Sequence, residues 1–268
     1  MRLLYCDESN LESRSGDFFL YGGVSIPGDS ALALSQRIDE IRSGENIPQD
    51  YLLKFNPGPE GMSHRDFIRV KEATIAAAVD AGVKLKTSFI LHDIATNPDE
   101  ARRNEINRIC YHFQCELEKD SECGVVLIDR FTDSQIDHHL REKFSTGITG
   151  LPYSPSVRLD RILGFHYAAI GQSHMASVVD VVLGSLRFAI NAHTRSQEQN
   201  LKTATTILSL LAPLYDTTPF GQIGETELFF SPKIVRSAQY RQQYESLKTF
   251  LADSGLHAQQ AISNQRMY

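Results

Sequence analysis

The chain has few cysteines and no Cys-x-x-Cys pair; its four cysteines are Cys6, Cys110, Cys115 and Cys123. Four are too few for a disulfide-stabilised scaffold in 268 residues, so we expect free thiols. A metal site that combines Cys110, Cys115 and Cys123 with His112 is disfavoured. Cys110 and Cys115 lie five residues apart on an expected helix, so their side chains diverge in direction.

Long apolar runs are also missing. No run approaches the roughly 20 residues needed to cross a bilayer. The first eight residues, MRLLYCDE, become acidic too early for a signal peptide. We therefore expect a cytoplasmic protein with no membrane partner.

An excess of positive charge is absent, since the formal net charge is −6. This balance excludes charge-driven coating of duplex nucleic acid, and any phosphate contact must come from a local patch. The hydrophobic content of 41% and the charged content of 22% are ordinary for globular domains, so the chain is expected to fold on its own. The sequence does not define an oligomeric state, and a homo-oligomer is compatible with it.

Several catalytic signatures are missing as well. The chain contains no phosphate-binding Gly-x-x-x-x-Gly-Lys loop, dinucleotide fingerprint, nucleophile elbow or His-Glu-x-x-His motif. Nucleotide-driven motors, dehydrogenases, α/β-hydrolases and zinc proteases are therefore disfavoured.

The chain does contain a regular alternation of expected strands and helices, which is typical of an α/β layer structure. Strands are expected over residues 2–6, 18–26, 51–55, 83–94, 124–128 and 161–170, and helices over 30–43, 63–81, 98–119 and 173–191. The first two strands are close enough in sequence to form a hairpin. The apolar 124–128 strand is expected to be central and buried, whereas the alternating 83–94 strand is expected to expose one face.

The later part of the chain is less regular. Residues 133–156 contain two glycines and two prolines, which predict a loop with one helical piece at its start. A polar segment over 191–200 suggests a boundary near residue 195. Residues 1–195 would form the core, and 196–268 an extension of two helices and a short strand at 227–230, packed on that core.

Two carboxylates lie at the ends of expected strands. Asp7 ends the first strand, and period-two alternation places it on the face of Leu3 and Tyr5, while Glu8 points to the other face. Asp129 ends the apolar 124–128 strand. Ligands usually bind at the carboxyl ends of strands in open α/β sheets, so Asp129 is a candidate site residue.

Asp180 is the most informative carboxylate, because it lies within a helix that is apolar on nearly every side, MASVVDVVLG. An unpaired charge there would be very costly. Most of its neighbours three and four residues away are small, including Ser177, Ala176 and Gly184, so another element or an ion can approach closely.

Simpler interpretations exist for each of these acids. Asp7 and Asp129 can start turns or cap the segments that follow. Asp180 can pair with Arg187, two turns along the same helix face, or with a buried backbone donor. Taken jointly, the three acids favour a site for a metal that binds phosphate oxygens, because such a metal needs several carboxylates from different elements.

Other polar residues are weaker candidates. Lys54 is a cation in an otherwise apolar expected strand, where it would neutralise the acids or bind phosphate, or else be an edge-strand lysine. His174 and Asp93 are more simply interpreted as surface and strand-end residues. The pair Gly22-Gly23 inside a strand suggests a bulge or a close backbone approach.

Taken together, five segments resemble a known prokaryotic family: YCDES at 5–9, YGGV at 21–24 leading to Ile26-Pro27, LLK at 52–54, LIDR at 127–130 and SVVDVVLG at 177–184. The chain resembles the domain-of-unknown-function 3800 family over about residues 1 to 195. The resemblance implies a ribonuclease H-like (retroviral integrase-like) fold with a mixed central sheet flanked by helices. It also implies that Asp7, Asp129 and Asp180 match the family's three acidic positions and Lys54 its strand lysine. The chain departs from the family at Leu52, where an acid is common.

These observations lead to a first hypothesis of a metal-dependent phosphodiesterase, most simply a nuclease. Asp7, Asp129 and Asp180 would coordinate one or two Mg²⁺ or Mn²⁺ ions, and Lys54 would hold the scissile phosphate or orient the water. DNA or RNA would be the substrate, guided by a local patch; the candidate contacts are Ser9, Arg130, Arg158, Arg161 and Arg187. The alternative is a non-catalytic module of the same fold that binds nucleic acid or a protein, in a defence system or mobile element. Hydrolysis of a small phosphoester is a third option.

Overall fold

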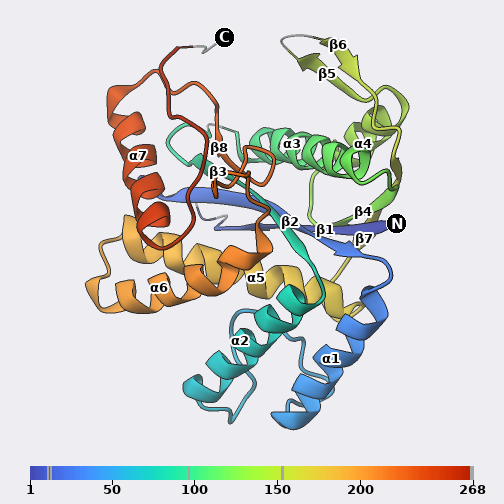
Figure 1. Cartoon of the computed structure of the whole chain (residues 1–268), viewed down its shortest axis with the longest axis vertical. Helices are drawn as coiled ribbons and strands as arrows, with labels where there is room; N and C mark the ends of the chain where they lie inside the picture. The colour runs from blue at the N-terminus through green and yellow to red at the C-terminus, as the bar shows by residue number, and fades with distance from the viewer. Residues whose placement is uncertain (11, 13, 96, 152–153, 266–268) are drawn as a thin grey trace.

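The computed structural model describes residues 1–10, 12, 14–95, 97–151 and 154–265, and Figure 1 shows its arrangement. The elements in chain order are β1 (Arg2–Ser9), β2 (Phe18–Pro27), α1 (Ala31–Gly44), α2 (His64–Asp80), β3 (Lys84–Leu91), α3 (Pro98–Lys119), β4 (Gly124–Asp129), α4 (Ile136–Ser145), β5 (Ile148–Leu151), β6 (Ser154–Val157), β7 (Ile162–Ala168), α5 (His174–Thr194), α6 (Glu198–Leu211), β8 (Leu228–Ser231) and α7 (Ala238–Asp253). The α/β class expected from the alternation is confirmed.

A six-stranded mixed sheet forms the centre, in the order β7-β4-β1-β2-β3-β8. β1 and β2 form the expected antiparallel hairpin, and β3 continues it antiparallel to β2. β4 pairs parallel with β1, β7 with β4, and β8 with β3. All strands of this sheet except β2 therefore run in one direction, which brings the carboxyl ends of β1, β4 and β7 to the same edge.

Helices cover both faces of the sheet (Figure 1). On one face, α3 and α4 pack on the side chains of β1, β4 and β7 that include Leu4, Cys6 and Val126. On the other face, α5 lies against β1 and β2, and α1, α2, α6 and α7 pack around α5. The β5–β6 hairpin forms a separate two-stranded sheet that stands away from the central one.

The main helices begin where the sequence provides caps. The Ser63 side chain accepts a hydrogen bond from the Asp66 N–H at the start of α2, and Asn97 caps α3, whose first residue is Pro98. The Ser173 hydroxyl accepts from the Met175 N–H at the start of α5. These local signals explain why the expected helices over 63–81, 98–119 and 173–191 are confirmed to within a few residues.

α5 is the central helix of the fold. By length and composition alone it is apolar enough to cross a membrane, but 78% of its most apolar window is buried inside the protein. Its apolar character on nearly every side follows from its position, since it packs on the sheet and on α6.

Three expectations about strands are wrong. Residues 51–55 form no strand but an irregular loop that packs on α5. β1 continues to Ser9, so Asp7 lies within the strand and not at its end. The polar face of β3 is not exposed, because Lys86 is only 1% exposed and lies between Glu116 and Glu227. In each case a contact with a distant segment outweighs the local pattern.

The irregular segment 133–156 is more ordered than expected. Its start is the helix α4, as expected, but the rest forms strands β5 and β6 in place of a loop; residues 152 and 153 lie outside the described residues. After residue 195, the chain forms α6, the short strand β8 and α7. Because β8 pairs with β3, residues on both sides of position 195 contribute strands to one sheet.

Candidate active site

Asp7 and Asp129 lie on neighbouring parallel strands. The β1–β4 register pairs Tyr5 with Leu127 and Cys6 with Ile128, so Asp7 follows at the position next to Asp129. Adjacent strands are about 4.8 Å apart. Both aspartates line one small cavity beneath α5, together with Tyr5 and Val179. The register therefore places two carboxylates side by side at the carboxyl edge of the sheet.

Asp180 comes to this edge from α5, which packs directly on β1 and β2. Gly22, the β2 partner of Asp7, has no side chain, and a Cβ there would lie 2.8 Å from Leu183 of α5. The expectation of a close approach at Gly22-Gly23 is confirmed. Gly184 allows a second approach, since a Cβ at this position would overlap the side chain of Phe55.

The loop containing Phe55 contacts Asp180 directly. The Phe55 N–H donates a 2.6 Å hydrogen bond to Oδ2 of Asp180. Lys54 and Arg187 are also near enough for their charges to favour the ionised form of Asp180 and to oppose the rise in its pKa. The structure thus brings Lys54 near Asp180 from a loop and not from a strand, and it supplies a backbone donor to the half-buried Asp180 carboxylate.

The three carboxylates repel one another. Burial, followed by the negative charges of Asp129 and Asp180, raises the pKa of Asp7 well above its usual value. Burial and the charge of Asp180 raise the pKa of Asp129. Burial also raises the pKa of Asp180, despite the opposing effects of Phe55, Arg187 and Lys54. The site therefore concentrates negative charge that nearby cations only partly offset.

The fit of these residues to a divalent cation depends on their free oxygens and their charge. Within the described ranges, no group of three or more His, Cys, Asp or Glu side chains is arranged to hold a metal ion. One oxygen of Asp180 accepts from Phe55, and one oxygen of Asp7 accepts from the Glu8 N–H at 2.7 Å. The donor chemistry nevertheless fits, because carboxylate oxygens are the ligands that Mg²⁺ and Mn²⁺ prefer and a cation would relieve the repulsion that raises these pKa values.

A groove of about 550 Å³ is lined by Ser9, Arg187 and Phe55, the residue whose N–H bonds Asp180. It lies between the end of β1, residues 55–56 and the carboxyl-terminal half of α5. The Asn10 and Asn191 side chains bond each other across it. Of the expected substrate contacts, Ser9 and Arg187 therefore share one concave surface.

The other expected contacts lie elsewhere. Arg130 is exposed beside Asp129 and does not line the groove. Arg161 lies just before β7, at the opposite edge of the sheet from Asp129, and donates to the Glu122 carbonyl. Arg158 donates to the Ser145 carbonyl and pairs with Asp160. Neither Arg158 nor Arg161 is therefore placed to guide a substrate to the three aspartates.

The weaker sequence candidates have structural partners. His174 lies 2.9 Å from Asp39, and Asp93 accepts from the Ser15 hydroxyl and the Gly16 N–H. The four cysteines are free, as expected. Cys110 is buried against the sheet, and no metal-holding group that includes a cysteine occurs in the described part of the chain.

Glu8 was placed on the opposite face by the alternation, and this is confirmed. It lies 3.3 Å from Arg102 of α3. Burial raises the pKa of Glu8 to about 7, with Arg102 opposing and Asp129 contributing to the rise. Period-two alternation could show its direction, but its partner on α3 had no signal in the sequence.

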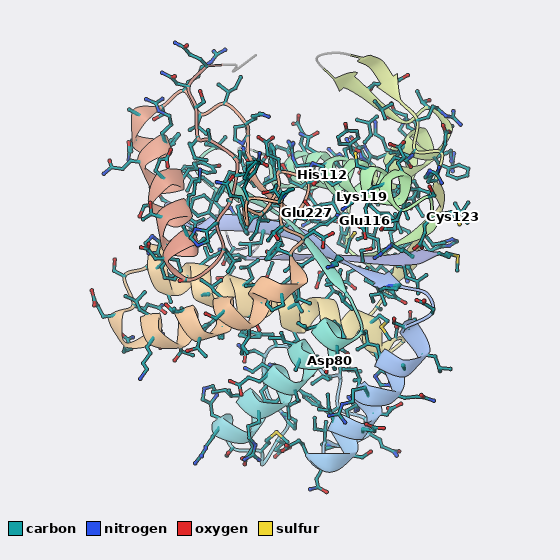
Figure 2. The ribbon with its side chains drawn as sticks, viewed as in Figure 1. Asp80, His112, Glu116, Lys119, Cys123 and Glu227 are labelled. Carbon is teal, nitrogen blue, oxygen red and sulfur yellow. The ribbon has the colours of Figure 1, made fainter. Side chains whose placement is uncertain are left out.

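A second charged cluster lies on the α3 face, away from the aspartates. Figure 2 shows His112, Glu116 and Lys119 along α3 with Glu227 beside them. Lys86 lies 3.1 Å from Glu116 and 3.2 Å from Glu227, and Arg2 lies 2.9 Å from Glu116. Because the buried charges are paired, this cluster joins β3 and β1 to α3 and the segment before β8. The spacing in sequence gave no indication of it.

A scan against protein-family models gave no match for this chain, and a search of curated proteins gave none either.

Proposed function

We propose that the protein is a divalent-metal-dependent phosphodiester hydrolase, most simply a nuclease. The observation that carries this proposal is that Asp7, Asp129 and Asp180 converge from two parallel strands and a facing helix, so that the charges of Asp129 and Asp180 raise the pKa of Asp7 and the charge of Asp180 raises that of Asp129. A structural cap or turn residue requires no such neighbours. A cation-binding site requires several neighbouring carboxylates, and when no cation is bound these carboxylates repel one another.

The topology supports the ribonuclease H-like fold that the resemblance to the domain-of-unknown-function 3800 family implies. The order β3-β2-β1-β4-β7, with β2 alone antiparallel, agrees with such a sheet. The helices α1 and α2 lie between β2 and β3 in the chain. The carboxylates lie at the carboxyl edge, where ligands bind in open α/β sheets.

The residues of the site would have distinct tasks. Asp7, Asp129 and Asp180 would hold one or two Mg²⁺ or Mn²⁺ ions, which when bound activate water and stabilise the leaving oxygen. Lys54, half-buried beside Asp180, would contact the scissile phosphate. Arg187 and Ser9 would position the part of the nucleic-acid substrate that lies in the groove. Arg130 would contact substrate phosphates on the far side of Asp129.

The test is cleavage of labelled single-stranded DNA, duplex DNA and RNA, and of bis-(p-nitrophenyl) phosphate, with Mn²⁺, with Mg²⁺ and with EDTA. We expect metal-dependent cleavage that falls at least 100-fold in Asp7→Asn and Asp129→Asn. Asp50→Asn is the matched control, because Asp50 is exposed and lies outside the site. Undiminished cleavage by both site variants would reject the proposal. Preference for the small diester would point to a small phosphoester as substrate.

One observation favours the alternative of a non-catalytic nucleic-acid-binding module. One oxygen of Asp180 already accepts a hydrogen bond from the Phe55 N–H, which leaves fewer free carboxylate oxygens for a cation. Calorimetric titration with Mn²⁺ separates the two functions. No heat of cation binding together with salt-sensitive binding of an oligonucleotide would favour the module, whereas cation binding lost in Asp7→Asn would favour the hydrolase.

A further inference from the structure

The Lys71 side chain of α2 is largely buried, and among the described residues no counter-charge pairs with its ammonium group. Its side chain is 8% exposed, and its Nζ lies 4.3 Å from the ring centre of Phe55 and 4.8 Å from that of Phe67. Within the described ranges, no hydrogen bond or ion pair reaches its Nζ. Burial lowers the pKa of Lys71, and no neighbouring charge contributes to that change. Two aromatic rings stabilise the cation, but no acid of the described residues neutralises it.

Lys71 lines a cavity of about 140 Å³ between α2, α5 and α6, here called the Lys71 pocket. Its wall is mostly apolar, with Ile75, Phe188 and Leu210 among its residues. Glu72 is the only acid among the described residues of this wall, and its side chain is exposed. The pocket is distinct from the groove beside Asp180, although Phe55 and Phe188 border both.

We propose that the Lys71 pocket binds a small apolar monocarboxylate, whose acid group pairs with the Lys71 ammonium. An apolar cavity of about 150 Å³ has room for one benzene-sized ring, so the body of the ligand has about six carbons. A carboxylate supplies the single negative charge that Lys71 lacks. A phosphate ester fits less well, because Lys71 is the one buried cation that the described wall offers for two charges.

Polar groups in the wall can complete the recognition of such a head group. Ser185, which is 2% exposed, lines the pocket and carries a hydroxyl donor, whereas the Thr206 hydroxyl in the same wall already donates to the Lys202 carbonyl. A carboxylate that pairs with the Lys71 ammonium and accepts a hydrogen bond from the Ser185 hydroxyl has both charge and hydrogen-bond partners, which a buried ion pair requires. The rings of Phe55 and Phe188 provide flat surfaces for the apolar body.

The test is calorimetric titration of the full chain with benzoate and hexanoate, compared with the neutral analogues benzyl alcohol and 1-hexanol. We expect both carboxylates to bind the wild type at least tenfold more tightly than the alcohols. Lys71→Met keeps the length of the side chain and removes the charge, so it should weaken carboxylate binding at least tenfold. Lys202→Met, on the exposed side of α6, is the control and should bind as the wild type does.

A second pair of variants tests the location without altering the buried lysine. Thr206→Trp places a bulky ring at an exposed position of the pocket wall and should block binding, whereas Thr205→Trp, exposed and outside the wall, should not. The proposal is overturned if no carboxylate binds the wild type, if alcohols bind equally well, or if Thr206→Trp binds like Thr205→Trp. None of these outcomes depends on hydrolase activity, so carboxylate binding by the Lys71 pocket can be rejected without affecting the proposed hydrolase function, and the reverse also holds.

Discussion

The Phe55 N–H donates a 2.6 Å hydrogen bond to the carboxylate of Asp180, joining two residues 125 positions apart in the sequence. This contact fixes an irregular loop to the central helix α5. It also gives a half-buried acid a partner that does not cancel its charge. Asp180 therefore has a structural task, which is to accept from Phe55, and a separate electrostatic one, which is to add negative charge beside Asp7 and Asp129.

The two tasks of Asp180 can be separated by two substitutions. Asp180→Asn keeps an oxygen that accepts from Phe55, so its free energy of unfolding should stay within about 1 kcal/mol of the wild type. Asp180→Ala leaves the Phe55 N–H without this acceptor and should cost about 1–3 kcal/mol. Urea denaturation measures both. Equal stability of the two variants would show that the hydrogen bond contributes nothing to folding.

Asp7→Asn should stabilise the protein in the absence of divalent cations. The pKa of Asp7 is raised in the folded state, so the folded protein binds more protons than the unfolded chain and loses stability as the pH rises above the ordinary Asp value. A tenfold change in the acidity of one group corresponds to about 1.4 kcal/mol of stability. Denaturation in EDTA should show a gain for Asp7→Asn at pH 8 that shrinks towards pH 4. A variant less stable than the wild type at pH 8 would contradict the repulsion.

Gly184→Ala tests the close approach of the Phe55 loop to α5. The new Cβ would overlap the side chain of Phe55, so the loop must move, and we expect a loss of about 1–3 kcal/mol. Gly44→Ala is the matched control in α1, because nothing lies within 4 Å of its Cβ. It should be neutral or stabilising by up to about 1 kcal/mol. Thermal and urea denaturation compare the pair, and similar values would argue against the steric account.

His112 should make the protein acid-sensitive. Burial, with the charges of Lys86 and Arg108, lowers the pKa of His112 to about 3. The unfolded chain therefore binds a proton at this residue that the folded chain does not, and stability falls as the pH drops from about 6.5 towards 3. His112→Phe should flatten the dependence of the free energy of unfolding on pH in that window. His138→Gln, at an exposed position, should leave it unchanged.

The direction of a side chain was predictable where it depends on the local period of a strand or helix. Alternation along the first strand placed Asp7 and Glu8 on opposite faces, and the structure has Asp7 beneath α5 and Glu8 against Arg102 of α3. The small residues around Asp180 indicated a close approach, and Gly184 provides one against Phe55. These features follow from the period of a strand or a helix, which the backbone fixes locally.

Contacts between distant segments were not predictable from the same patterns. The alternating β3 strand suggested an exposed polar face, yet Lys86 is buried between Glu116 and Glu227, acids 30 and 141 positions further along the chain. The apolar run at 51–55 suggested a strand, yet it pairs with no strand of the described chain and packs on α5 instead. A polar pattern shows that a residue needs a partner but does not show which one.

The sequence alone determined the α/β class, the approximate bounds of the helices over 63–81, 98–119 and 173–191, and the opposite faces on which Asp7 and Glu8 lie. Only the tertiary structure decided that the Phe55 N–H donates to Asp180, that β8 joins the sheet beside β3, and that Lys71 lines an apolar pocket in which no described acid pairs with its ammonium group. The division has a physical cause. Local geometry repeats along the backbone every two or 3.6 residues, whereas packing between distant segments depends on the shapes and charges of side chains that meet only in the folded chain.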